Sequence, residues 1–133
     1  MTGDGTGPPR SELEQYAADL FVREDPLLAD LRAELAARGF PTVQVPARTG
    51  LLLSILVRAC GARRVLEVGA LGGYSALWMA SSLPPEGRLV TLEKEPKHAE
   101  LAREFIERAG RSELIEVRVG NAVDLLPAVE DDG

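Results

Sequence analysis

The segment Arg64–Ser75, with the sequence RVLEVGALGGYS, constrains the fold more than any other part of the chain. Its first five residues are apolar on both faces of an extended chain, which is typical of a strand in a parallel sheet. The glycines at 69, 72 and 73 follow. Glycine permits unusual backbone angles and leaves no side chain in the way of a ligand. The next residues begin a helix, whose first N–H groups suit a carboxylate or phosphate, with the hydroxyl of Ser75 as a further donor. The segment predicts a strand, a ligand-binding turn and a helix.

Strands and helices alternate from this segment onward, which predicts an α/β fold with a parallel sheet and right-handed crossovers. The predicted strands cover 64–68, 88–93 and 114–119, and the predicted helices cover 74–82, 96–109 and 121–129. A helical segment precedes them, with helices that begin at Ser11 and Pro26 and a third over 47–60. An extended connector, Phe40–Pro46, separates the last two. Residues 1–10 are rich in glycine and proline and predict a disordered tail, which leaves 11–133 as one domain.

Composition and charge limit the classes of partner. The chain has 133 residues and a formal net charge of −6, which argues against nucleic acid or an anionic membrane as the main partner. Its apolar runs are too short to span a bilayer. No apolar signal core follows the first methionine, so we expect a cytoplasmic protein. The single cysteine, Cys60, is interpreted as inert filling of the core.

The spacing of the glycines separates the possible nucleotide ligands. A dinucleotide-binding turn has the pattern G-x-G-x-x-G, but Leu71 and Tyr74 occupy its second and third glycine positions. A P-loop needs G-K-[ST], which is absent. The pattern that does occur is Glu67-x-Gly69-x-x-x-Gly73. Glu93 ends the second predicted strand, where an acid accepts hydrogen bonds from a ribose in doubly wound folds. A dehydrogenase fragment is therefore disfavoured, although it stays open.

These motifs, in this order, resemble the N-terminal portion of class I O-methyltransferases that depend on S-adenosylmethionine (SAM), of the metal-dependent caffeoyl-CoA and catechol type. The likeness covers about Tyr16 to Leu126, and Gln44-Val45 matches the segment that precedes the first strand in that family. The resemblance implies a Rossmann-like SAM-methyltransferase fold whose C-terminal strands are absent from this chain. We therefore expect 11–133 to be a truncated methyltransferase domain.

The resemblance also implies the cofactor-binding residues. Val45 would touch the methionine part of SAM, and Gly69 and Ser75 its amino-acid end. Glu93 would bind the ribose. Asn121 replaces the usual aspartate beside the adenine, where the backbone of Ala122 keeps a possible contact. The complete implied set is Val45, Glu67, Gly69, Gly73, Tyr74, Ser75, Glu93 and Ala122.

The resemblance implies a divalent metal of the Mg or Ca type as well, but its ligands follow later strands that this sequence does not contain. Asp131 and Asp132 are interpreted as a solvated tail, so we assign no metal-binding and no catalytic residue. The expected function is methyl transfer from SAM to a hydroxyl of a small molecule, with this chain carrying the SAM-binding half and inactive alone. The alternative is a non-catalytic remnant that binds SAM or S-adenosylhomocysteine (SAH), or that pairs with a full-length homologue.

Two further expectations concern packing. The first predicted strand has an unpaired apolar edge, so we expect a homodimer that covers it. Trp78 is interpreted as a packing residue. His98, the only histidine, is interpreted as a surface residue.

Overall fold

The computed structural model describes residues 11–131, so the predicted tail over 1–10 and the interpretation of Asp132 fall outside the described residues. Three helices come first, and strands and helices then alternate. The elements are α1 (Glu12–Phe21), α2 (Pro26–Ala37), α3 (Ala47–Ala59), β1 (Arg64–Val68), α4 (Tyr74–Ala80), β2 (Arg88–Glu93), α5 (Pro96–Arg108), β3 (Ile115–Val119) and α6 (Ala122–Asp131). Every helix and strand predicted from the sequence is present, with ends that differ by one or two residues.

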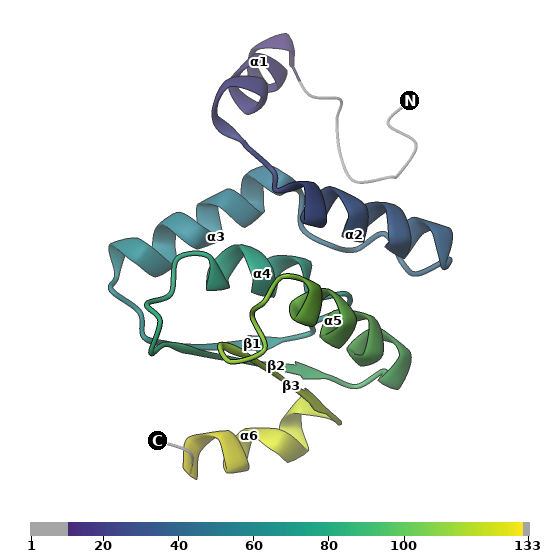
Figure 1. Cartoon of the computed structure of the whole chain (residues 1–133), viewed down its shortest axis with the longest axis vertical. Coiled ribbons are helices and arrows are strands. Elements are labelled where there is room, and N and C mark those ends of the chain that lie inside the picture. Colours follow the sequence, from purple (N-terminus) through teal and green to yellow (C-terminus); the bar gives the residue numbers. More distant parts are fainter. Residues whose placement is uncertain (1–10, 132–133) are drawn as a thin grey trace.

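The three strands form one parallel sheet in the order β1-β2-β3. Helices α2 to α5 lie on one side of this sheet and α6 lies on the other, while α1 lies farthest from the sheet (Figure 1). β2 is the central strand, and all of its residues after Arg88 are buried. The predicted α/β fold with parallel strands and crossover helices is therefore confirmed.

Local sequence signals determine where the helices begin and end. Ser11 and Glu14 form a reciprocal capping box at the start of α1, which satisfies backbone donors that would otherwise have no partner. Asp25 caps α2 through the N–H of Leu27, and Pro26 occupies its first position. Gly39 follows α2 with a positive φ of 69°, a backbone conformation that ends helices.

Trp78 packs in the core, as the sequence predicted. Its indole lies so close to Gly50 of α3 that a Cβ on that glycine would approach the ring to 2.3 Å. The contact explains how α3 and α4 approach each other closely. The interpretation of Cys60 as core filling is wrong, because its thiol is exposed. Cys60 caps the C-terminal end of α3, where the chain has already left the packed face of the helix.

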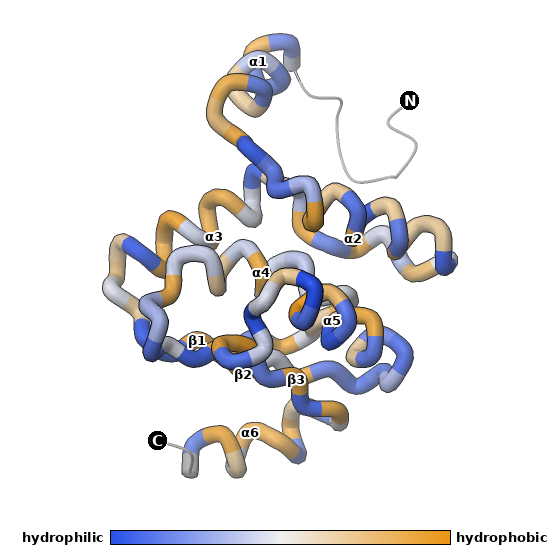
Figure 2. Tube along the Cα trace, in the orientation of Figure 1, coloured by the Kyte–Doolittle hydropathy of each residue, from blue (hydrophilic) through white to orange (hydrophobic). Residues whose placement is uncertain are grey.

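Apolar side chains also lie on the surface. On the outer edge strand β1, Leu66 is 45% and Val68 is 64% exposed. Helix α1 buries none of its residues, although Figure 2 shows hydrophobic positions along it. Its exposed apolar or aromatic side chains are Leu13, Tyr16, Leu20 and Phe21. No helix among residues 11–131 is long and apolar enough to cross a membrane.

Candidate functional site

A pocket of about 250 Å³ lies between the connector Phe40–Pro46 and the turn that follows β1. We call it the connector pocket. It lies at the carboxyl end of the parallel strands, where α/β sheets bind their ligands. The pocket brings together five residues of the predicted cofactor set and does not include the other three. Its lining consists of Pro41, Val43, Gln44, Val45, Gly69, Ala70, Leu71, Tyr74, Ser75, Glu93 and His98.

The three glycines of the turn have two different roles. One borders the pocket, and the other two pack against neighbouring helices. Gly69 has a φ of 92°, and a Cβ built on it would meet no atom within 4 Å. By contrast, a Cβ on Gly72 would approach Leu31 and Leu35 of α2 to 3.0 Å. Gly73 has a φ of 84° and lies against Ala102 of α5. Gly69 therefore borders open space, while Gly72 and Gly73 allow close packing and do not line the pocket.

Glu93 is 6% exposed and holds the turn in place. Its Oε2 accepts a hydrogen bond from the N–H of Leu71 at 2.8 Å, and its Oε1 accepts one from the N–H of Glu95 at 3.0 Å. Leu71 has a positive φ of 49°, which is uncommon for a residue other than glycine. This conformation was not predictable from the sequence, because it depends on a carboxylate from the neighbouring strand.

Glu67 lies behind the pocket and does not line it. Its Oε2 accepts a hydrogen bond from Ser75 Oγ at 2.5 Å, and its Oε1 accepts one from Thr91 Oγ1 at 2.7 Å. Burial raises the pKa of the Glu67 carboxyl, the two hydroxyl donors oppose that rise, and the negative charge of Glu93 adds to it. Glu67 therefore fixes Ser75, which does line the pocket, and places a second carboxyl near Glu93.

Tyr74 lines the pocket and connects it to the segment between α1 and α2. Its ring is 1% exposed, and its hydroxyl donates to Glu24 Oε1 at 2.6 Å. Arg32 donates to both oxygens of the same carboxylate. Burial, followed by the hydrogen bond to Glu24, raises the pKa of Tyr74 to about 12. The sequence did not predict this network, because its members are far apart along the chain.

The interpretation of His98 as a surface residue is wrong. The side chain is 20% exposed and lines the pocket, with Nδ1 3.7 Å from Glu93 Oε1. Its ring lies 4.8 Å from the ring of Phe40, measured between centroids. The reason is the short connection after β2, since α5 begins at Pro96 and its first turn stays at the carboxyl end of the sheet.

Ala122 belongs to the predicted cofactor set and Gln44 does not, yet only Gln44 lines the pocket. Ala122 begins α6 and does not line the pocket, but the neighbouring Gly120 N–H donates to the Glu93 carbonyl at 2.9 Å, so α6 starts beside the end of β2. Gln44 lines the pocket, and its Oε1 is buried with no hydrogen-bond partner. Its only signal in the sequence was its position directly before Val45.

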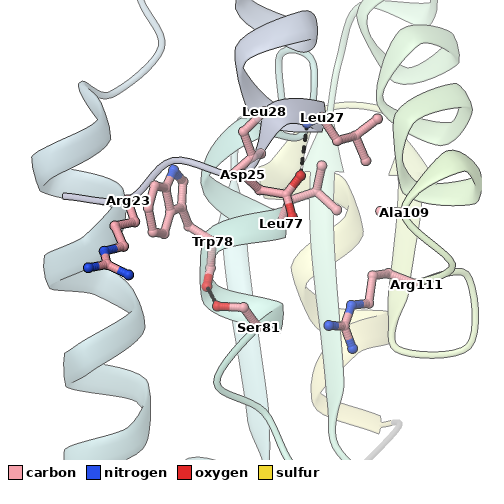
Figure 3. Close-up of a pocket in the computed structure, with 9 residues that line it drawn as sticks. All are labelled: Arg23, Asp25, Leu27, Leu28, Leu77, Trp78, Ser81, Ala109 and Arg111. Carbon is pink, nitrogen blue, oxygen red and sulfur yellow. Dashed lines mark hydrogen bonds between the residues drawn. The ribbon is translucent and has the colours of Figure 1, made fainter.

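A second pocket of about 270 Å³ lies where α4 and α5 end, away from the connector pocket. Its polar lining includes Arg23, Arg111 and Asp25, and the Asp25 carboxylate is engaged with the N–H of Leu27 (Figure 3). None of the predicted cofactor residues lines it. In the described part of the chain, no group of three or more His, Cys, Asp or Glu side chains is arranged to hold a metal ion.

Comparison with solved structures places this architecture among methyltransferases. The O-methyltransferase from Bacillus cereus, solved in complex with SAH, superposes with a TM-score of 0.86 at 41% sequence identity, covering 92% of this chain and 56% of that one. The O-methyltransferase TomG from Streptomyces achromogenes, involved in tomaymycin synthesis and solved in complex with SAM, has a TM-score of 0.83 at 42% identity. That match covers 89% of this chain and 53% of TomG.

Comparison with curated proteins gives the same result. The catechol O-methyltransferase of Mycobacterium tuberculosis is 43% identical over 122 residues, which is 92% of this chain and 56% of the relative. That of Niastella koreensis is 41% identical over 121 residues, 91% of this chain and 55% of the relative. The chain thus spans about half the length of the relatives that it matches. The sequence model of the O-methyltransferase family matches residues 16–133, and the chain therefore belongs to the O-methyltransferase family.

Proposed function

We propose that this chain carries the SAM-binding half of an O-methyltransferase and binds SAM in the connector pocket. The observation that carries the proposal is the convergence of Val45, Gly69, Tyr74, Ser75 and Glu93 on one pocket from three separate segments of the chain. Similar structures solved with SAM, at 42% identity, and with SAH, at 41% identity, support the same ligand.

The chemistry of the pocket fits this cofactor. SAM carries a positive sulfonium, an α-ammonium, a carboxylate and a ribose diol. The carboxylates of Glu93 and Glu67 give the region negative charge, which suits a cationic ligand. Gly69 leaves open space where a side chain would stand, and the unpartnered Oε1 of Gln44 offers an acceptor.

Each predicted residue has a proposed role that its position supports. Glu93 accepts from the ribose diol, because each of its oxygens accepts one protein hydrogen bond and a carboxylate oxygen can accept a second. Gly69 and Ser75 border the amino-acid end, and Val45 contacts the methionine chain. In supporting positions, Glu67 orients Ser75, Gly73 and Tyr74 shape the turn, and Ala122 lies towards the adenine.

SAM supplies an activated methyl group for direct displacement by a nucleophilic oxygen. The contribution of this chain is alignment of the cofactor. The proposed acceptor is a hydroxyl of a small molecule, as the names of the catechol O-methyltransferases suggest. The described residues form no cluster suited to a divalent cation, so we assign no step to a metal, and we expect no methylation of catechol by this chain alone.

Isothermal titration calorimetry of the purified chain with SAH and with NAD tests the cofactor proposal. We expect saturable binding of SAH at one site per chain and no binding of NAD, because the glycine spacing does not match a dinucleotide turn. Binding of NAD without binding of SAH would overturn the proposal. SAH binding without methylation of catechol is the result expected of this chain alone, and the alternative of a non-catalytic SAH-binding chain shares it.

We also propose that 11–133 is a single domain that forms a homodimer through the outer edge of β1. The exposed Leu66 and Val68 on an unpaired strand edge support this. Light scattering should find the Val68→Lys variant as a monomer. The matched variant Val123→Lys removes a valine that is 74% exposed on α6, and it should leave the dimer intact. A monomeric wild-type chain would contradict the proposal.

The proposed location is the cytoplasm. The exposed, unpaired thiol of Cys60 supports it, because free thiols persist in reducing compartments. Fractionation of the producing cells, with the chain detected by antibody, tests this location, and recovery from the extracellular fraction would contradict it.

A further inference from the structure

Gln44 contains a buried acceptor that the protein does not satisfy. The side chain comes from the connector and lines the connector pocket, and its Oε1 is inaccessible to solvent and has no hydrogen-bond partner. Among the described side-chain atoms, only the indole nitrogen of Trp78 is likewise buried without a hydrogen-bond partner. A buried polar atom without a partner is costly and is rare in native structures. Because this side chain belongs to the lining of the connector pocket, a ligand in the pocket is the natural source of the missing donor.

The carboxylate acceptors near the pocket already have protein donors. The two oxygens of Glu93 accept from Leu71 and Glu95. The two oxygens of Glu67 accept from Ser75 and Thr91. Among the described side chains that line this pocket, Gln44 Oε1 is therefore the one buried atom that has no hydrogen-bond partner. It immediately precedes Val45, whose proposed contact is the methionine chain of the cofactor.

We propose that Gln44 is a cofactor-binding residue, whose Oε1 accepts a hydrogen bond from the α-ammonium of SAM. The proposal rests on the proposed function. The α-ammonium is the donor that most needs an acceptor, because it carries a positive charge and three N–H groups. It also lies at the same end of the cofactor as the methionine chain beside Val45. Gln44 would thus select ligands that carry the amino-acid part.

Calorimetry with two ligands isolates this contact. SAH contains the α-ammonium, whereas 5′-methylthioadenosine keeps the ribose and adenine but lacks the amino-acid part. We expect Gln44→Leu to weaken SAH binding by about ten- to hundred-fold, the range for a hydrogen bond to a charged group, and to change 5′-methylthioadenosine binding less than about threefold. Gln44→Glu keeps an acceptor and should bind SAH within about threefold of wild type. Gln15→Leu, on exposed α1, serves as the control.

The melting temperature without ligand gives an independent readout. Because Gln44→Leu removes a buried acceptor that has no partner, the variant should melt at or above the wild-type temperature while it binds SAH more weakly. A large fall in melting temperature would contradict the premise that the oxygen is unsatisfied.

The possible failures are distinguishable. Unchanged SAH affinity in Gln44→Leu would overturn the assignment of Gln44 and leave the proposed function standing. Equal losses for SAH and 5′-methylthioadenosine, or a loss in Gln44→Glu as large as in Gln44→Leu, would also overturn it. A wild-type chain that binds neither ligand would overturn the proposed function itself.

Discussion

At the scale of the residue, Gly69 combines a backbone requirement with a proposed ligand contact. Its φ of 92° disfavours any side chain, although space for a Cβ is open. Gly61 has a φ of 62° and is equally open, but it lies at the end of α3 and outside the connector pocket. Substitutions at these two glycines therefore distinguish the effect of backbone strain, which both share, from the loss of a ligand contact, which only Gly69 would show.

We expect Gly69→Ala and Gly61→Ala each to lower the free energy of unfolding by about 1 kcal/mol, because both place a side chain at positive φ. Only Gly69→Ala should also weaken SAH binding. Urea denaturation and calorimetry measure the two effects. Equal SAH affinities for the two variants would show that Gly69 does not border the cofactor.

Glu67 provides a prediction about pH. Because burial raises its pKa in the folded chain, the folded state binds more protons than the unfolded state between the ordinary value of 4.5 and the raised value. Stability from this group is therefore fully present below pH 4.5 and is lost as pH rises through the raised pKa. The free energy of unfolding of the wild type, compared with that of the non-titrating Glu67→Gln variant, should be highest at low pH and should fall as pH rises.

Urea denaturation of both chains between pH 4 and pH 7.5 measures this difference. Glu100→Gln, at an exposed position of α5, is the control and should stay within about 0.5 kcal/mol of wild type. A wild type that gains stability over Glu67→Gln as pH rises would mean that the hydroxyl donors outweigh burial.

At the scale of the element, the Tyr74 hydroxyl joins α4 to the segment between α1 and α2 through Glu24 and Arg32. Tyr74→Phe should lower the free energy of unfolding by about 1 kcal/mol, the value of one hydrogen bond. Tyr16 on α1 is 61% exposed, so Tyr16→Phe should change the free energy of unfolding by less than about 0.5 kcal/mol. Chemical denaturation compares the two variants, and equal effects would show that the link contributes no stability.

The elements themselves were well predicted from the sequence, since caps such as Ser11 and Asp25 are local signals. The site was predicted only where a motif or resemblance marked it, as for Gly69 and Glu93. The positive φ of Leu71 and the burial of Gln44 Oε1 were not predictable. Each depends on contacts between segments that are far apart in sequence, and no local pattern reports them.

At the scale of the whole molecule, the sheet has a buried central strand and two edge strands, β1 and β3. β2 is buried in the centre, whereas β1 exposes Leu66 and Val68. The connector pocket does not involve this open edge and is lined only by residues that the chain itself supplies. The proposed cofactor pocket therefore lies within a chain that spans about half the length of the relatives that it matches.

The most direct test is a two-dimensional 15N–1H NMR titration of the chain with SAH, which reports where the ligand binds. We expect amide shifts to cluster at residues 43–45, 69–75 and 93–95 and to saturate at one ligand per chain. Shifts that cluster instead around Leu27, Ala109 and Arg111, in the pocket of Figure 3, would contradict it, as would a spectrum that SAH leaves unchanged.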